Sequence, residues 1–489
     1  MKRLIIPIFI LKRPRSSLLG IFIMTSIQRA KNFYLLCWLI GISIISACQN
    51  NDIIVTSEDS EEFQDTTLVS IKELVNPELT IQERIISQKA DTFRVMRDGQ
   101  TVAIVRLGNP IIVAQSEKWE TWGYFQFPKI YRCENGYLIV EWQNDEDSYT
   151  SYGKDNYRRL MSKDEGKTWE PLDREYFHKE PRRVEYDNGD VLQVKDPVAK
   201  DINIYPEFPK PVNNQRIDRY DFYLESEVPK ELQGAYLELW SRQENKTTII
   251  HSTINDPGLL RYTVDGQMPI VFWGDLKLLP NGDLIAGITG GYYQNSEGVV
   301  QKAPVSFYKS SNSGRHWDIL GKIQYQKEGN ENCPFDGSEG FEEPTFEILR
   351  DGSFLCVMRN GSSSPMYRAF SYSDGTQWTT PEPFTPNGVM PSLKLLDNGI
   401  LVLTSGRPGV QIRFSLDGDG KKWTEPIDML PFVDEKGNLD TWVTCGYCRI
   451  MSTDDHSFYM VYSDFRCKNI NGEYIKTILF RKVEVNKRG

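Results

Sequence analysis

An acidic and a basic residue at the two ends of one expected hairpin are the first candidates for chemistry. Glu343 precedes a strand-like run, an Asp-Gly turn at 351–352 and a second apolar run that ends at Arg359. A hairpin of this kind brings its ends together, so the carboxylate and the guanidinium are expected side by side. An arginine directly after Leu-Cys-Val-Met is poorly placed for a surface residue, which favours a functional pair over a solvated Glu343 with a surface ion pair.

A second arginine lies in a turn that can orient it. Arg407 occupies the centre of Ser-Gly-Arg-Pro-Gly, where glycine and proline predict a rigid turn. Such a turn can present the guanidinium to two acceptor atoms at once. The alternative is a structural arginine that holds carbonyl groups of the same turn.

Short strand-like runs follow turn dipeptides from about residue 95 onward. Each begins with Asn-Gly or Asp-Gly, the strongest short signal for a β-hairpin, and continues as an alternating or β-branched run. Five of these runs lie at 135–142, 188–194, 281–288, 351–358 and 398–403, and a sixth with a weaker turn lies at 454–464. Small antiparallel sheets repeated tens of residues apart predict an all-β propeller.

A second repeat, Ser-x-Asp-x-Gly-x-x-Trp with local variation, is superposed on the first. Its four copies lie at 162–169, 310–317, 371–378 and 415–423. In such a segment the Ser or Asp side chain caps a tight turn, Gly supplies a positive φ and Trp is buried between blades. The repeat resembles the Asp-box (BNR repeat) of the sialidase, or neuraminidase, superfamily. The resemblance implies one six-bladed propeller over residues 95–489, with a strand pair in 195–265 forming the second blade.

The resemblance also implies roles for the candidate residues. Sialidases place three arginines around a substrate carboxylate, use a tyrosine nucleophile activated by a glutamate, and use an aspartate as acid/base. Glu343 and Arg359 match the segment with the glutamate and the second arginine, and Arg407 matches the third arginine by its spacing before the fourth Ser-x-Asp turn. Tyr447 matches the nucleophile and Asp147 the acid/base.

Tyr447 lies in Cys-Gly-Tyr-Cys, which is similar to the segment that carries the nucleophile in sialidases. Tyr462 is the competing choice, although it lies within a strand, where a tyrosine is more often a packing residue. A free phenol has a pKa of about 10, so attack requires that this proton be lost. A hydrogen bond to Glu343 and two nearby arginines are expected to lower the pKa of Tyr447.

Asp147 is the acid/base candidate because it lies between the strand at 135–142 and the first Ser-x-Asp turn, as the acid of sialidases does. Asp145 and Glu146 precede it directly, and an ordinary solvated loop has the same composition. Asp155 is a further rival in the same loop.

The chain departs from the sialidase pattern at the first arginine. Sialidases begin the first blade with a Phe-Arg-Ile-Pro-like motif, whereas this chain has Gln126 within Phe-Gln-Phe-Pro. A neutral amide can still bind one sugar oxygen, but loss of a charged bidentate contact costs about 1.5–3 kcal/mol. Either Arg158 or Arg159 compensates, or the substrate is another sugar, or the site binds without cleaving.

These residues predict an exo-acting retaining glycoside hydrolase that releases a terminal sugar, sialic acid or another acidic sugar, from glycans. One alternative is a non-catalytic glycan-binding propeller at the cell surface, which the loss of the first arginine favours. The other is a glycosidase or lyase of different specificity on the same fold. Only 4 histidines are present, so few residues could serve a lyase or a zinc hydrolase.

No metal and no organic cofactor is expected. Cys445 and Cys448 form a Cys-x-x-Cys pair, but no second pair and no nearby histidines complete a zinc site. Two alternatives remain for these cysteines. Either Cys445 or Cys448 forms a disulfide with Cys467, or all three are buried free thiols.

The N-terminal segment resembles the signal peptide of a bacterial lipoprotein. Basic residues precede an apolar run at 33–45, and the run ends in Ile-Ser-Ala-Cys, with Cys48 as the residue that receives lipid. We expect residues 1–47 to be a signal-peptide region with Met24 as the true start, and residues 48–94 to be an acidic linker and lead-in. This predicts an outer-membrane or cell-surface lipoprotein, facing outward or toward the periplasm, whose only membrane contact is the anchor at Cys48.

Charge excludes nucleic acid as a partner. The net charge is −10, and the first 47 residues carry seven Lys/Arg and no Asp/Glu, which leaves −17 for the rest. A body this acidic repels nucleic acid and anionic lipid surfaces. A glycan is therefore the expected partner.

Overall fold

A computed structural model describes residues 67–71 and 90–488 with short gaps. The gaps are residues 149–150, 152, 175, 177–182, 213–219, 271–272, 326–338, 362–363, 431–442 and 455. The chain divides into two compact units, Met1–Asp65 and Thr66–Gly489, and all of the described residues belong to the second. The expected signal peptide, Met24 and Cys48 lie outside the described residues. Within the described part, no helix has the length and apolar character needed to cross a membrane.

The described residues form β-strands and two 3-10 turns, Ile202–Ile204 and Lys230–Leu232, so the expected all-β class is confirmed. Two sheets are four-stranded meanders in chain order. The first consists of β20 (Glu342–Ile348), β21 (Phe354–Arg359), β22 (Met366–Ser371) and β23 (Glu382–Thr385). The second consists of β24 (Val389–Leu395), β25 (Leu401–Gly406), β26 (Val410–Ser415) and β27 (Ile427–Leu430).

Three more groups of strands precede these meanders. The first group is β5 (Tyr124–Arg132), β6 (Leu138–Asn144) and β7 (Tyr157–Ser162). The second is β8 (Arg183–Glu185), β9 (Val191–Lys195), β12 (Ala235–Ser241) and β13 (Lys246–Asn255), in which the pair expected at 195–265 is β12 and β13. The third is β16 (Trp273–Leu278), β17 (Leu284–Thr289), β18 (Val305–Ser310) and β19 (His316–Ile323). A short parallel pairing of β13 with β19 joins the last two groups into one eight-stranded sheet.

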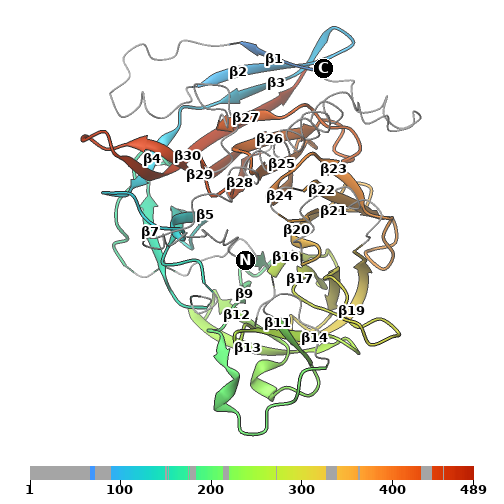
Figure 1. Cartoon of the computed structure of the whole chain (residues 1–489). Helices are drawn as coiled ribbons and strands as arrows, with labels where there is room; N and C mark the ends of the chain where they lie inside the picture. The colour runs from blue at the N-terminus through green and yellow to red at the C-terminus, as the bar shows by residue number, and fades with distance from the viewer. Residues whose placement is uncertain are drawn as a thin grey trace, which may run out of the picture. The chain divides into compact units, whose positions relative to one another are not determined.

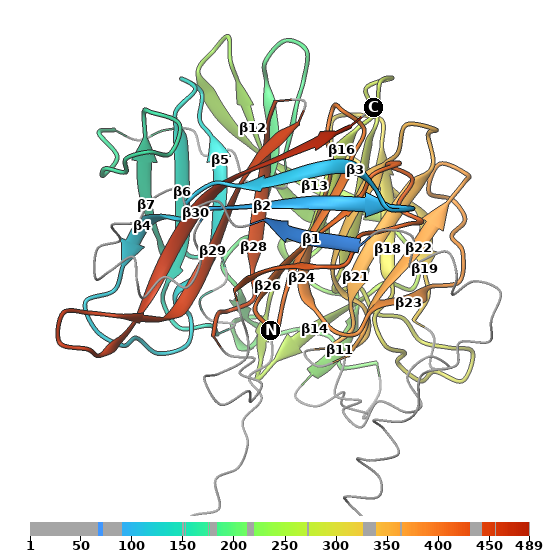
Figure 2. The same cartoon turned by 90° about the horizontal axis from the view of Figure 1, so that it is seen from above.

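Strands from both ends of the described chain share the last sheet. Its strands are β28 (Cys448–Asp454), β29 (Ser457–Lys468), β30 (Tyr474–Lys487), β3 (Gln100–Leu107), β2 (Asp91–Arg97) and β1 (Thr67–Ile71), with β4 (Ile111–Gln115) also paired to β30. Figure 2 shows β1, β2 and β3 side by side in this sheet. Thus β1 and most of β2 fall inside the stretch 48–94 that was expected to be linker and lead-in.

The first strand of each group packs beside the first strand of the next. β5 contacts β28, β28 contacts β24, β24 contacts β20, β20 contacts β16, and β16 contacts β8. Figure 1 shows these sheets following one another in chain order around a common centre. The apolar cores lie between neighbouring sheets; one of them, for example, combines Leu355 and Val357 of β21 with Leu401 and Leu403 of β25.

The four Ser-x-Asp-like segments form one kind of turn. In each of them the serine Oγ accepts a hydrogen bond from the glycine N–H, and the glycine has a positive φ of 70–84°. The four bonds are Gly166 to Ser162 at 2.8 Å, Gly314 to Ser310 at 2.9 Å, Gly375 to Ser371 at 2.9 Å and Gly420 to Ser415 at 3.2 Å.

The tryptophan of each segment packs against a neighbouring sheet. The Trp378 ring stacks on Phe307 of β18 with 4.2 Å between the ring centres, and the Trp169 ring meets Phe480 of β30 at 5.4 Å. Trp317 is fully buried in the core that contains β9 and β12. These rings fill the space between sheets, as the repeat predicts.

A further small sheet was not expected from the sequence. It consists of β10 (Lys200–Asp201), β11 (Tyr220–Leu224), β14 (Leu260–Val264) and β15 (Gln267–Met268). Tyr220 and Tyr262 stack in its core with 4.7 Å between ring centres. A buried ion pair between Arg261 and Glu225 fastens the sheet to the chain before β12, since both residues also bond to the backbone of Gly234.

Candidate active site

Three of the strands that start a group have a β-bulge just before a proline. Phe127 in β5, Glu343 in β20 and Met390 in β24 each precede proline, and each has a positive φ, of 53°, 47° and 46°. The strand register shifts at the same three places. A bulge interrupts the alternation of side chains, so two consecutive residues can face the same centre. In a non-glycine residue such a φ is strained, and it persists only when surrounding contacts hold it.

Glu343 accepts hydrogen bonds from three other residues of the site. Its Oε1 accepts hydrogen bonds from the Tyr447 hydroxyl and from Arg359 Nη1, the latter at 2.8 Å, and its Oε2 accepts from the Met390 N–H at 2.7 Å. The structure therefore brings together three of the residues singled out in the sequence, although Tyr447 lies 104 residues from Glu343.

Glu343 is held in its ionised form. Burial by itself raises the pKa of this carboxyl, but the charge of Arg359 and the hydrogen bonds from Tyr447 and Met390 outweigh it and lower the pKa below its ordinary value. A buried carboxylate with three such partners can accept a proton at neutral pH.

Tyr447 differs from expectation in one respect. Burial, followed by the negative charge of Glu343, raises the pKa of Tyr447 well above its ordinary value, and the opposing charges of Arg359 and Arg407 do not compensate. The expectation of a lowered pKa was wrong, because a carboxylate that accepts the phenol proton also stabilises the protonated phenol. The phenol is 5% exposed and keeps its proton until it reacts.

Arg359 faces two carboxylates. Besides its bond to Glu343, its Nε donates to the Gly361 carbonyl at 3.0 Å and lies 3.6 Å from Glu342 Oε2. These carboxylates raise the pKa of Arg359 against the effect of burial. Burial raises the pKa of Glu342, and Arg359 opposes this.

Sequence reasoning missed Glu342. The signal that could have found it is the Glu-Glu-Pro run: a bulge before proline turns both carboxylates toward Arg359.

Arg407 bonds to a carbonyl outside its own turn. Its Nε donates to the Cys445 carbonyl at 3.2 Å, which fixes the segment that carries Tyr447. Its guanidinium also lies over the Trp122 ring, 5.4 Å from the centre. Burial and the like charge of Arg359 lower the pKa of Arg407. A Cβ at Gly446 would lie 2.8 Å from Arg407 Cγ, so this close approach requires glycine.

Asp147 reaches the site through an aromatic residue that sequence reasoning also missed. Asp147 is 8% exposed, and its Oδ2 accepts a hydrogen bond from Trp122 Nε1 at 2.9 Å. Trp122 in turn contacts Arg407 and the Phe127 ring, and the Phe127 ring lies 4.7 Å from the Tyr447 ring. A continuous series of side-chain contacts therefore leads from Asp147 through Trp122 and Phe127 to Tyr447.

The rival acids of this loop have other partners. Asp145 Oδ2 accepts from Asn156 Nδ2 at 2.7 Å and shapes the loop. Asp155 is paired with Arg159 at 2.7 Å, and Arg159 also bonds to Glu141 at 3.1 Å.

Gln126 is fully buried. Its Oε1 accepts from the Gly123 N–H at 3.0 Å, whereas its Nε2 has no hydrogen-bond partner among the described residues. Gly123 lies directly against the backbone of Asp145 and Asp147, which leaves no room for a Cβ. Gln126 thus supports the turn on which the Asp147 loop packs. Arg158, one of the expected substitutes for the missing arginine, is exposed.

Tyr462 and the cysteines belong to the core. Tyr462 is fully buried, and burial raises its pKa to about 12. Cys445, Cys448 and Cys467 are buried free thiols, so of the two alternatives the thiols hold and the disulfide does not. In the described part of the chain no cluster of three or more His, Cys, Asp or Glu could hold a metal ion.

No protein-family model and no curated protein matches the sequence. Among solved structures, a protein of unknown function from Dyadobacter fermentans is similar with a TM-score of 0.54 at 15% identity, over 78% of this chain and 99% of that one. The Hadza microbial sialidase Hz136 matches with a TM-score of 0.47 at 14% identity, over 82% of this chain and 74% of that one. A Trypanosoma rangeli sialidase matches with a TM-score of 0.39 at 13% identity, over 74% of this chain and 55% of that one. The Dyadobacter match shows a shared fold, and the chemistry has to be argued from the site itself.

Proposed function

We propose that this chain is an exo-acting retaining glycoside hydrolase that releases a terminal sugar from glycans. The observation that carries the proposal is the hydrogen-bonded cluster of Tyr447, Glu343 and Arg359, where β20 and β28 begin and β21 ends. In the proposed architecture the six groups of strands close into a six-bladed, sialidase-like propeller, and the four Ser-x-Asp turns are Asp-boxes.

The first step forms a bond between the enzyme and the sugar. Tyr447 Oη attacks the anomeric carbon while its proton passes to Glu343 Oε1, with which it already shares a hydrogen bond. Asp147 gives its proton to the departing glycosidic oxygen, and the bond between that oxygen and the anomeric carbon breaks. The raised pKa of Tyr447 requires that proton transfer and attack occur together, with Glu343 as general base.

The second step returns the enzyme to its starting state. Asp147, now ionised, takes a proton from a water molecule, whose oxygen attacks the anomeric carbon from the vacated side. The bond to Tyr447 breaks, and the phenolate takes its proton back from Glu343. Two displacements at one carbon retain the configuration. No metal or organic cofactor enters these steps.

A tyrosine nucleophile suits an acidic sugar, because a carboxylate nucleophile would repel the substrate's own carboxylate. In the proposal, Arg359 and Arg407 bind that acidic group or another polar group. Gln126 and Glu342 work against a carboxylate, since the first removes a positive charge and the second adds a negative one beside Arg359. The sugar is therefore either sialic acid, another acidic sugar or a neutral sugar of the same shape.

The first experiment uses protein that starts just after Cys48, beside its Tyr447→Phe variant. A panel of fluorogenic glycosides includes an α-sialoside, a uronide and neutral sugars. Release of fluorophore that is lost in Tyr447→Phe supports the mechanism, and the glycoside that reacts identifies the sugar. Equal turnover by Tyr447→Phe would sink the mechanism.

The second candidate function is a non-catalytic glycan-binding protein, which Gln126 favours because it stands where sialidases have the first arginine. The carboxylate of Glu343 beside the Tyr447 phenol opposes it, since a binder needs no proton acceptor. Glycan binding without product over a long incubation would select this candidate.

The location is a proposal as well. We propose that residues 1–47 are removed or serve as a signal, and that Cys48 carries the lipid that holds the protein at the outer membrane or cell surface. A Cys48→Ser variant is expected to leave the membrane fraction and to lose incorporation of labelled fatty acid. A variant that stays lipidated and membrane-bound would contradict the anchor.

A further inference from the structure

Two exposed aromatic side chains line a hollow at one edge of the last sheet. The hollow has a volume of about 530 Å³ and is lined by Lys118, Trp119, Glu473 and Tyr474. Trp119 is 54% exposed and Tyr474 is 52% exposed. We propose that this hollow is a second carbohydrate subsite, which binds sugar units on the leaving-group side of the glycan. The inference rests on the proposed function, because it extends the same substrate beyond the bond that is cleaved.

The composition of the hollow matches a sugar ring. The face of a pyranose presents C–H groups that pack on an aromatic ring, and its edge presents hydroxyls that need hydrogen-bond partners. Trp119 and Tyr474 supply the rings, whereas Lys118 and Glu473 supply a donor and an acceptor at the same hollow. Tyrosine and tryptophan give large contact areas at little entropic cost, which suits a binding surface.

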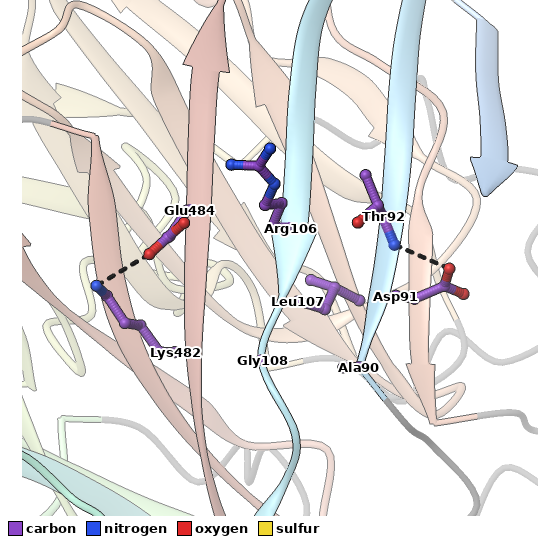
Figure 3. A pocket seen from close by; sticks show the side chains of 8 residues that line it. All are labelled: Ala90, Asp91, Thr92, Arg106, Leu107, Gly108, Lys482 and Glu484. Carbon is purple, nitrogen blue, oxygen red and sulfur yellow. Dashed lines mark hydrogen bonds and ion pairs between the residues drawn. The ribbon is translucent and has the colours of Figure 1, made fainter. Parts of the chain in front are cut away.

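Another hollow, of about 220 Å³ between β2, β3 and β30, is different (Figure 3). None of its lining residues is aromatic. Its Lys482 and Glu484 form an ion pair at 3.0 Å, visible as a dashed line in Figure 3. It offers no surface on which a sugar ring could stack.

Packing contacts and hydrogen bonds hold Trp119 and its loop in position. Its ring meets Phe465 edge-on with 6.2 Å between the ring centres, and Lys476 Nζ lies 5.5 Å from the centre of the Trp119 ring. Lys476 is 1% exposed, and its Nζ donates to the Thr121 carbonyl at 2.6 Å and the Tyr124 carbonyl at 3.0 Å. These bonds tie the loop that carries Trp119 to β30, so little ordering is needed when a ligand binds.

The hollow lies at the same end of the strands as the candidate active site. Phe465 also contacts Trp122, at 6.5 Å between ring centres, and Trp122 touches both Asp147 and Arg407. Along the sheet, Cys448, the residue after Tyr447, pairs with Tyr462 in the middle of β29. From there β29 continues past the start of β28 to Lys468, which pairs with Tyr474.

The hairpin between β29 and β30 carries Tyr474 at this end, and Figure 2 shows it extending past β4. A glycan that leaves the site past Asp147, the proposed donor to the leaving oxygen, therefore meets Trp119 next.

The test measures binding separately from cleavage. Glu343→Gln is the background, so that bound glycan stays intact, and a printed array of acidic and neutral oligosaccharides and monosaccharides is the probe. Trp119→Ala and Tyr474→Ala are each expected to weaken binding of the best oligosaccharide by roughly tenfold, as loss of one stacked ring does. The difference in affinity between that oligosaccharide and its terminal monosaccharide should shrink in both variants.

Tyr372→Ala is the matched control. Tyr372 is 65% exposed and lies in the third Ser-x-Asp-like turn, at the far end of the strands from Tyr447. It should bind the array as the Glu343→Gln background does. Equal affinity of Trp119→Ala and Tyr372→Ala, with unchanged melting temperatures, would overturn the subsite, and so would an array on which no oligosaccharide binds better than its monosaccharide.

The two proposals fail in different ways. If Glu343→Gln binds oligosaccharides through Trp119 but the wild-type protein cleaves no glycoside, the subsite stands and the hydrolase does not. If the wild-type protein cleaves glycosides but Trp119→Ala does not change the affinity for oligosaccharides, the hydrolase stands and the subsite does not.

Discussion

At the scale of single residues, opposing electrostatic effects at Glu343 decide the chemistry. Burial favours its neutral form, and Arg359, Tyr447 and Met390 together favour its charged form. The same contact has the opposite effect on Tyr447, whose proton is retained. The pair is poised for transfer of one proton during attack rather than before it.

Removal of the Arg359 charge is expected to move the acid side of the pH–kcat profile to higher pH. In the native protein the lowered pKa of Glu343 keeps the base ionised, and therefore active, down to pH values below those of an ordinary carboxyl. In Arg359→Gln the pKa of Glu343 rises, so activity is lost earlier as the pH falls. Arg158→Gln, which removes an exposed arginine, is the control and should leave the profile unchanged. An unmoved acid limb in Arg359→Gln would show that Glu343 is not the titrating base.

Glu342 is expected to select against acidic sugars. In Glu342→Gln the charge beside Arg359 is removed at nearly constant shape. The ratio of kcat/KM for an acidic over a neutral glycoside should rise roughly fivefold, which corresponds to about 1 kcal/mol at this separation in a partly screened site. A ratio that stays constant, while both substrates are cleaved, would rule out this role.

At the scale of elements, bulges and tight turns position the site. The bulges of β5, β20 and β24 break the alternation of each strand at its start, and each lies directly before a proline. Without the bulge only one of Glu342 and Glu343 could face Arg359, because neighbouring strand residues point to opposite sides. At the far end, the four serine–glycine turns hold the strands against the next sheet.

The turn glycines are expected to differ in their tolerance of a side chain. Gly314 has φ +77°, and a Cβ there would lie 2.4 Å from Leu237 Cδ1, whereas Gly352 has φ +84° and nothing within 4 Å. Gly314→Ala should lower the free energy of unfolding by about 2–4 kcal/mol, through backbone strain and overpacking together. Gly352→Ala isolates the strain and should lower it by about 1–2 kcal/mol. Urea unfolding measures both, and equal losses would contradict the packing role of the turn.

At the scale of the whole described unit, the two ends of the chain are joined in one sheet. β3 pairs with β30 in the register that places Val105 opposite Val485, and both side chains are fully buried. Val483 and Val485 therefore belong to the core although they lie near the C-terminal end of the described residues.

A chain that ends after Lys482 is expected to lose this closure. It lacks Val483 and Val485, which are both fully buried, and most of the hydrogen bonds between β3 and β30. The free energy of unfolding should fall by at least about 3–5 kcal/mol, as for loss of two buried valines and their backbone partners. A chain that ends after Asn486, which lacks only the last three residues, should unfold close to the native midpoint in urea. Similar midpoints for the two truncations would show that the pairing contributes little.

The sequence by itself determined the class of fold and the set of candidate active-site residues. Asn-Gly and Asp-Gly turns and the Ser-x-Asp-like repeat are local signals, because turn chemistry depends on a few adjacent residues. For the same reason Glu343 and Arg359, joined by one hairpin, could be paired without a structure.

Only the tertiary structure decided the contacts between distant segments and their electrostatic consequences. The bond between Tyr447 and Glu343, the contact of Asp147 with Trp122 and the burial of Gln126 depend on packing between sheets. The direction of the pKa shift of Tyr447 depends on burial and on the sum of nearby charges, which no local pattern records. The sequence therefore predicted which residues could act, and the packing of the sheets decided how their protons are held.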